Sequence, residues 1–135
     1  MVGRQSSLSQ YQNAQFQTAD RGTILLLMFD GALKFLTLAE SSLEEHDLVR
    51  FGHNLGRAQA VIAELLHTLD HKVGGEIAAN LERLYRFMLE HLVEANVRKS
   101  SKHVADVKRI LSIIASAFRE ILANGLPNVD KLDAA

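Results

Sequence analysis

The chain has 135 residues, 47% of them hydrophobic, which is the size and composition of one domain with a single core. Fifteen Lys and Arg against sixteen Asp and Glu give a formal net charge of -1, so the chain has no large electrostatic attraction to nucleic acid or to anionic lipid. It contains no cysteine, which excludes disulfides and thiolate metal sites and is compatible with a reducing cytoplasm. We expect one domain without a nucleic-acid partner.

Residues 1–17 form a polar leader rich in Gln and Ser. A secretory signal would instead place an apolar run after a basic cluster. The longest apolar run of the chain, residues 24–29, is far shorter than the roughly 20 residues that cross a bilayer. We therefore expect a cytoplasmic protein without membrane insertion. Leu8 and Tyr11 are apolar points in the leader, which is either a flexible tail or a latch that lays both side chains into a groove.

The first two predicted helices cover about residues 20–44 and 47–71. Side-chain oxygens at residues 18–20 can cap the free amides of the first helix. A short turn and cap at residues 46–47 precede the second helix. Its apolar residues alternate in steps of three and four, which is typical of a bundle seam.

Two further helices are predicted over about residues 75–98 and 101–123. Gly74-Gly75 breaks the chain before the third helix, and two serines can cap the fourth. Four helices of about 20 residues joined by short turns predict an all-α fold, an up-down antiparallel four-helix bundle over residues 18–124. The leader is expected to form a short extra helix or a latch, and residues 125–135 a flexible tail.

The third and fourth helices carry more apolar surface than one bundle seam requires. Each has a second ridge about 100° around the helix from its main seam. The main seam of the third helix is Ile77, Leu81, Leu84, Met88, Leu92 and Ala95. The second ridges consist of Tyr85, Leu89, Val93, Ile110, Ile113 and Ala117. They form either a wide core that contacts two neighbouring helices or a groove for an amphipathic helix of another chain.

Common catalytic and metal-binding patterns are incomplete in this chain. A di-iron bundle needs a Glu-x-x-His from each of two helices, and the pair Glu64 and His67 is the only such spacing. His67 and His71 are four residues apart and could share a metal with Glu64, but we favour surface histidines. No Gly-rich phosphate loop and no Ser-His-Asp arrangement is evident. We expect neither an enzyme nor a bound cofactor.

Asp30 and Gly31 interrupt the apolar first helix. We expect Gly31 to allow close helix packing. Asp30 is expected to accept a hydrogen bond from Tyr85 or from an Asn side chain, because buried polar groups are nearly always paired. A polar contact from Asp30 to the backbone of a bound chain is the alternative.

Several segments, in their order and spacing, resemble the FliS family of flagellin export chaperones over nearly the whole chain. The strongest is residues 74–88, GGEIAANLERLYRFM. The other matching pieces are Tyr11-Gln12, Thr18-Ala19-Asp20, residues 27–32, Ala58 to Leu65, Leu92, Ala95-Asn96 and Ala117 to Ile121. Arg21 and Phe118 depart from the pattern, because the family commonly has proline and tryptophan at these positions.

The resemblance implies a bundle that binds the disordered carboxy-terminal segment of flagellin, its client. It implies that the chaperone prevents premature polymerisation and assists delivery to the flagellar type III export apparatus. The client would fold into helices along apolar surface, and the leader around Tyr11 would influence access to it. Carried onto this chain, the client-binding residues are Tyr11, Ile62, Leu65, Leu69, Leu81, Tyr85, Met88, Ile110, Ile113 and Ile114.

The resemblance also suggests the export gate and other flagellar regulatory proteins as further partners. The free chain is expected to be a monomer or a weak homodimer. Two other hypotheses remain open from the residues alone. One is a structural bundle without a client that covers its extra ridges by self-association, and the other is a metal enzyme centred on Glu64, His67 and His71.

Overall fold

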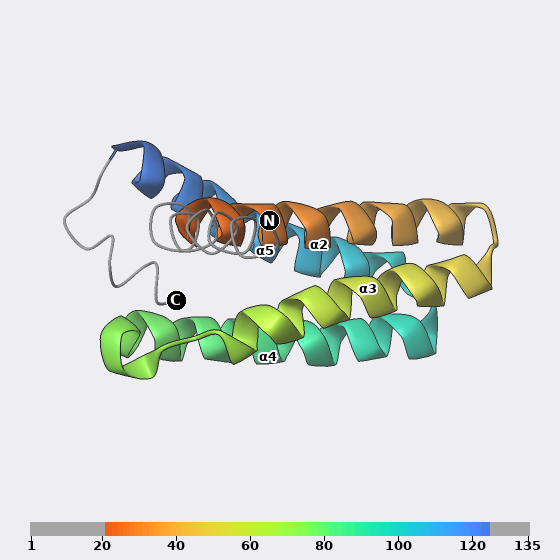
Figure 1. Cartoon of the computed structure of the whole chain (residues 1–135). Coiled ribbons are helices and arrows are strands. Elements are labelled where there is room, and N and C mark those ends of the chain that lie inside the picture. Colours follow the sequence, from red (N-terminus) through yellow and green to blue (C-terminus); the bar gives the residue numbers. More distant parts are fainter. Residues whose placement is uncertain (1–20, 125–135) are drawn as a thin grey trace, which may run out of the picture.

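The structure is a computed structural model that describes residues 21–124. These residues form four helices, and no strand occurs among them. The helices are α2 (Arg21–Glu44), α3 (Leu48–His67), α4 (His71–Arg98) and α5 (Ser101–Asn124). Each helix runs antiparallel to the next (Figure 1). The predicted all-α, up-down antiparallel four-helix bundle is confirmed, whereas the predictions for the leader and the tail lie outside the described residues.

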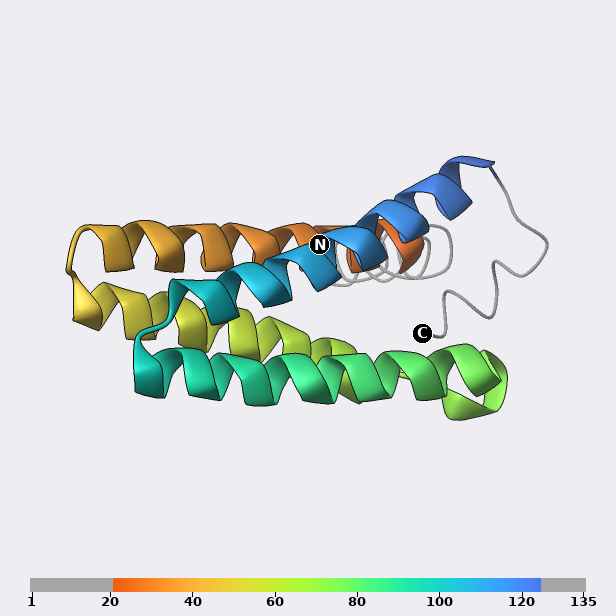
Figure 2. The same ribbon diagram turned by 180° about the vertical axis from the view of Figure 1, so that it is seen from behind.

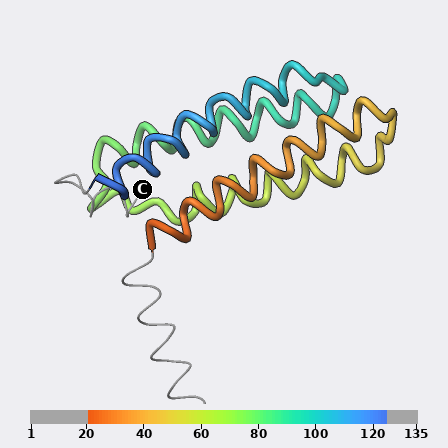
Figure 3. The backbone as a smooth tube through the Cα atoms, turned by 90° about the horizontal axis from the view of Figure 1, so that it is seen from above, coloured from red at the N-terminus to blue at the C-terminus, as the bar shows by residue number. Residues whose placement is uncertain are grey.

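The helices are arranged in a ring, in which each packs against its neighbour in sequence and α5 closes on α2. Viewed from above, α2 and α3 form one pair and α4 and α5 the other (Figure 3). The core lies along the common axis, where each helix contributes a row of side chains spaced by three or four residues. Its largest completely buried side chains are Phe29, Leu36, Phe51, Leu55, Ile62, Leu65, Tyr85, Met88, Leu92 and Leu111.

The turn between α2 and α3 has the predicted cap. The Asp47 carboxylate accepts a hydrogen bond from the Arg50 backbone amide at 3.1 Å and so satisfies one of the free amides at the start of α3. The other end of α3 differs from the prediction, because the helix ends at His67 and not at residue 71. Asp70 begins the next helix instead.

The predicted glycine break lies inside α4 rather than before it. The Asp70 carboxylate accepts hydrogen bonds from the backbone amides of Lys72 and Val73 at 3.0 and 3.2 Å, so α4 begins with one turn from His71. Gly75 then has φ 54° and ψ -124°, a backbone conformation that is not helical and that glycine adopts most readily. The kink at Gly75 separates this turn from the long straight part of α4.

The carboxy-terminal part of α5 diverges from α4 (Figure 2). There α5 packs against the start of α2, where Leu122 covers Gly22. A Cβ atom on Gly22 would lie 2.5 Å from Leu122 Cδ2, so the two helices approach this closely only because residue 22 has no side chain. Side chains of α4 and α5 line an apolar cavity at this end of the bundle.

Two expectations for Asp30 and Gly31 were wrong. The Asp30 carboxylate accepts hydrogen bonds from Arg119 Nη2 at 3.0 and 3.2 Å, on the exposed side of the α2/α5 contact. The hydroxyl of Tyr85 is buried and has no hydrogen-bond partner among residues 21–124. Gly31 does not mark close packing either, because nothing lies within 4 Å of the position of a Cβ atom.

Among residues 21–124, α2 is the one helix long and apolar enough to cross a membrane by length and composition. Its most apolar stretch of 18 residues has a mean hydropathy of 1.6. The uninterrupted apolar run at residues 24–29 is only six residues long and did not indicate so apolar a helix. The core helix of a bundle passes the same test, and Phe29, Ala32, Leu36 and Ala39 of α2 are completely buried against the other helices. We therefore interpret α2 as a core helix.

Candidate functional site

An apolar cavity of about 250 Å³ lies where α5 diverges from α4. The α4 residues that line it are Ile77, Asn80 and Leu81, and Asn80 is the one polar residue in the lining. The α5 residues are Ile113, Ile114, Ala117, Phe118 and Ile121. Such a lining can take up aliphatic or aromatic side chains of a partner but offers few hydrogen bonds.

Two rows of side chains continue from this cavity along the outer side of the α4/α5 contact. The α4 row is Ile77, Asn80, Leu84, Phe87 and His91, and the α5 row is Ile121, Ala117, Ile113, Ile110, Asp106 and His103. Steps of three and four place each row on one helix face, and the antiparallel helices bring the rows together. We call the surface between them the α4/α5 groove.

The middle of the α4/α5 groove exposes large apolar side chains. Leu84 is 37% exposed, Phe87 is 45% exposed and Ile113 is 64% exposed. Single exposed apolar side chains are normal on a protein surface, and a patch of them beside an apolar cavity is a common feature of surfaces that contact other chains.

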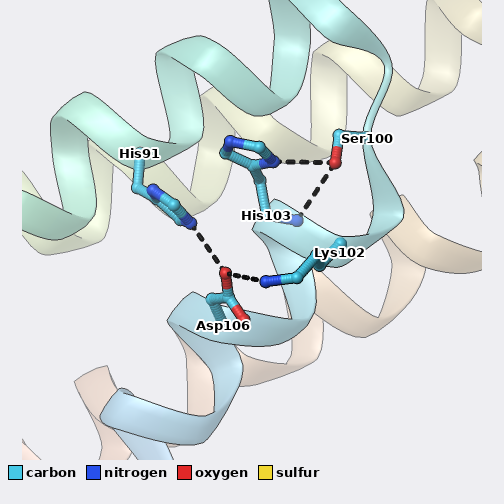
Figure 4. Close-up of polar contacts among 5 residues, drawn as sticks. All are labelled: His91, Ser100, Lys102, His103 and Asp106. Carbon is cyan, nitrogen blue, oxygen red and sulfur yellow. Dashed lines mark hydrogen bonds and ion pairs between the residues drawn. The ribbon is translucent and has the colours of Figure 1, made fainter.

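The end of the α4/α5 groove opposite the cavity is polar (Figure 4). His91 Nε2 lies 3.0 Å from Asp106 Oδ2, which also accepts a hydrogen bond from Lys102 Nζ at 3.2 Å. The hydrogen bond with His91, and then the one from Lys102, hold the pKa of the Asp106 carboxyl below its ordinary value. These contacts join α4 to α5 at the end where the two helices lie close together.

Ser100 caps α5 at the same polar end, as the sequence predicted for the two serines. Its hydroxyl oxygen accepts a hydrogen bond from the backbone amide of His103 at 3.2 Å and lies 2.7 Å from His103 Nδ1. The His103 ring stacks on the His91 ring with 4.3 Å between centroids, and the Phe87 ring also stacks on the His91 ring at 4.9 Å. The rings therefore link the polar end of the groove to its apolar middle.

The predicted client-binding residues occupy different environments. Ile62, Leu65, Tyr85 and Met88 are completely buried in the core. Leu81 and Ile114 are nearly buried but line the cavity, and Ile113 is exposed beside it. Leu69 and Ile110 are partly buried against the core, while Leu8 and Tyr11 lie outside the described residues.

The two predicted ridges also separate in the structure. The α5 ridge of Ile110, Ile113 and Ala117 faces the groove, whereas on α4 Tyr85 is in the core and Val93 is exposed. Sequence reasoning missed Phe87 as a groove residue and assigned Leu84 to the main seam. The signal that could have found them is the row with steps of three and four from Ile77 to His91.

The residues of the metal-enzyme hypothesis do not form a site in the described part of the chain. No three His, Asp or Glu side chains of residues 21–124 lie close enough together to hold a metal ion. His71 contacts the Glu82 carboxylate at 2.9 Å, within α4.

The bundle and its groove define a class of protein, an all-α four-helix module with an exposed apolar groove along two of its helices. Comparison with known proteins is consistent with this class. The chain matches the family described as "Flagellar protein FliS" over residues 4–125. The chain therefore belongs to the FliS family, a family of chaperones and not of enzymes.

Named relatives support this assignment. The chain is 38% identical to the flagellar secretion chaperone FliS of Salmonella typhimurium over 99 residues, 73% of each chain. It is 32% identical to the flagellar secretion chaperone FliSB of Pseudomonas aeruginosa over 116 residues, which is 83% of this chain and 92% of the relative. It is 30% identical to FliS of Bacillus subtilis over 118 residues, 87% of each chain.

Proposed function

We propose that this chain is a cytoplasmic export chaperone that binds the disordered carboxy-terminal segment of flagellin. In this role it prevents premature polymerisation of flagellin and assists its delivery to the flagellar type III export apparatus. Membership of the FliS family supports the secretion role. The observation that carries the binding role is the α4/α5 groove, whose exposed side chains Leu84 and Phe87 on α4 and Ile113 on α5 fit the apolar face of a client helix.

The size of the apolar surface favours an extended contact. Covering six aliphatic side chains contributes on the order of 10 kcal/mol, at about 1.5 to 3 kcal/mol each. A disordered client loses about 1 kcal/mol or more of backbone entropy for each residue that becomes ordered. A single short helix in the cavity would therefore bind weakly. We expect the client to follow the groove over several turns and to continue onto other faces of the bundle.

Residues at different depths would contribute to binding in different ways. Ile113, Leu81, Ile114 and the partly buried Ile110 can contact a client directly in this conformation. Ile62, Leu65, Tyr85 and Met88 would do so only if the bundle opened, and otherwise they hold the groove helices in place. Their role as client contacts, and that of Leu69 and Tyr11, stays a prediction. We also keep the proposal that Leu8 and Tyr11 of the leader cover the groove when no client is bound.

Titration with a flagellin carboxy-terminal peptide tests this function. The expected result is a one-to-one complex with new helical circular dichroism signal at micromolar concentration. Ile113→Asp places a charge in the groove and should weaken binding at least tenfold. The matched control is Val97→Asp, because Val97 is 73% exposed and lies outside both groove rows. Absence of binding by the unaltered chain would refute the proposed function.

Self-association without a client is the competing function. It makes a different prediction for sedimentation, namely a stable dimer that the flagellin peptide does not dissociate. The chaperone proposal predicts a monomer or a weak homodimer whose self-association the peptide abolishes. The export gate and other flagellar regulatory proteins remain proposed further partners.

A further inference from the structure

Helix α4 ends with a left-handed residue that turns the chain back on itself. Lys99 has φ 50° and ψ 51°, and its backbone amide donates a hydrogen bond to the carbonyl oxygen of Ala95. The backbone amide of Ser100 donates to the same oxygen at 3.0 Å. This last hydrogen bond is typical of the Schellman motif, which often packs the second residue after the helix against the residue five positions before it.

The sequence after α5 is suited to the same motif. It continues with Gly125, Leu126 and Pro127, which lie outside the described residues. Glycine is the residue most often found at the left-handed position that Lys99 occupies after α4, because it has no Cβ atom. Proline shortly after a helix end cannot continue the helix. Gly125 therefore corresponds to Lys99, and Leu126 is the residue that the motif would pack back on α5.

The residue five positions before Leu126 is Ile121, in the last turn of α5. Ile121 is partly buried and lines the apolar cavity together with Ile77 of α4. Apolar side chains at these two positions of a Schellman motif are frequently in contact. A contact between Leu126 and Ile121 would place the leucine at the cavity, whose described lining contains no charged side chain and suits an aliphatic group.

We propose that Gly125 ends α5 in a Schellman motif and that Leu126 fills the apolar cavity when no client is bound. We call residues 125–127 the plug. The occupant of the cavity is thus a segment of the same chain, attached to the helix that forms one wall. Leu126 follows the last residue of α5 by two positions, so bringing it to the cavity costs little chain entropy.

The plug competes with the client, and this consequence rests on the proposed function. A client helix that follows the whole α4/α5 groove takes the space of Leu126 at the cavity end. The free energy of displacing the leucine then lowers the affinity for the client, and the plug returns when the client leaves. The leader is proposed to cover the groove through Leu8 and Tyr11, whereas the plug fills only the cavity.

Methyl NMR of the free chain tests the plug without any client. Nuclear Overhauser effects are expected between the δ-methyl groups of Leu126 and the methyl groups of Ile77 on the opposite helix. Contacts of Leu8 or Tyr11 with Ile77 in place of Leu126 would assign the cavity to the leader. Leu126 contacts that disappear on dilution would assign it to a second copy of the chain. Either result, or the absence of contacts between Leu126 and the cavity residues, would overturn the proposal.

Titration with the flagellin carboxy-terminal peptide tests the competition. Leu126→Ser should raise the peptide affinity about fivefold, because the client no longer displaces a partly buried leucine. The matched control is Leu132→Ser, which makes the same change in the same segment and should leave the affinity unaltered. Equal affinities of the two variants, or weaker binding by Leu126→Ser, would show that the plug does not compete with the client.

The two experiments separate the plug from the proposed function. A peptide that binds neither the unaltered chain nor Leu126→Ser would refute the function, while the methyl contacts between Leu126 and Ile77 alone decide whether the plug exists. Peptide binding that is insensitive to Leu126 would refute the competition and leave the chaperone function intact.

Discussion

His91 Nε2 of α4 lies 3.0 Å from Asp106 Oδ2 of α5, and this contact ties the two groove helices together at their polar end. Both side chains are largely covered, at 19% and 25% exposed. The opposite end of the same helix pair is open and apolar. The groove thus has one end fixed by a polar contact and one end that opens into an apolar cavity.

The Asp106 contact predicts a dependence of stability on acid. The hydrogen bond with His91, and secondly that from Lys102, lower the pKa of the Asp106 carboxyl. A carboxyl whose pKa is lower in the folded chain than in the unfolded chain, where it is about 3.9, stabilises the fold at higher pH. This stabilisation is lost as pH falls below about 3.9 and through the folded-state pKa. Asp106→Asn should therefore be less stable than the unaltered chain near pH 6, and the difference should shrink below about pH 4. Urea unfolding at several pH values checks this, and a difference independent of pH would contradict it.

Gly75 should resist substitution more than a helical glycine does. Its positive φ favours glycine, so Gly75→Ala should lower the free energy of unfolding by about 1–2 kcal/mol. Gly56 is the matched control, because it is helical and has nothing within 4 Å of a Cβ position. Gly56→Ala should raise the free energy of unfolding by about 0.5–1 kcal/mol. Equal effects of the two substitutions would disprove the kink as described.

Tyr85→Phe should stabilise the chain. The hydroxyl is buried without a partner among residues 21–124, and an unpaired buried donor costs roughly 1–3 kcal/mol. We expect a gain of about 1 kcal/mol in the free energy of unfolding, measured by urea denaturation. A loss of stability of the same size would show that the hydroxyl has a partner in the folded protein.

The same tyrosine predicts a dependence on alkali. Burial raises the pKa of the Tyr85 hydroxyl above its ordinary value of about 10. Because this pKa is higher in the folded chain than in the unfolded chain, the tyrosine of the unfolded chain ionises first as pH rises. The free energy of unfolding therefore falls above the unfolded-state pKa. The advantage of Tyr85→Phe over the unaltered chain should consequently grow above about pH 10. An advantage that stays constant between pH 8 and pH 11 would argue against a buried phenol.

Met88 and Ile113 should separate stability from client binding. Met88 is completely buried, so Met88→Ala should lower the free energy of unfolding by about 2–5 kcal/mol. Ile113→Ala should change it by less than about 0.5 kcal/mol, since most of the side chain is exposed, yet it should weaken binding of the flagellin peptide. Thermal unfolding and peptide titration of both variants check this pair. Unchanged peptide affinity of Ile113→Ala would remove Ile113 from the binding surface.

The sequence predicted the elements well, because caps and apolar spacing are local. Asp47 caps α3 as expected, and the helix bounds differ from the predictions by no more than four residues. The larger differences lie at the turn after α3, where the carboxylate of Asp70 starts α4 earlier than the glycine pair suggested. Asp70 caps one additional turn, and the non-helical backbone at Gly75 keeps a break between that turn and the rest of α4.

The candidate site was harder to predict, because exposure depends on how the helices diverge. Tyr85 was placed on a second ridge and Leu84 on the main seam, yet Tyr85 is buried and Leu84 faces the groove. Successive residues of an α-helix are separated by about 100° around the helix axis. A small change in the direction of a neighbouring helix therefore decides whether a side chain lies in the core or on the surface. The pairing of Asp30 with Arg119 joins positions 89 residues apart, which no local pattern indicates.

Amide hydrogen exchange of the intact chain, with and without a saturating flagellin carboxy-terminal peptide, tests the central claim most directly. The account predicts new protection along α4 from Ile77 to His91 and along α5 from His103 to Ile121, because the client covers the groove between these rows. A complex that forms while both rows keep their exchange rates would contradict the assignment of the α4/α5 groove as the client-binding surface.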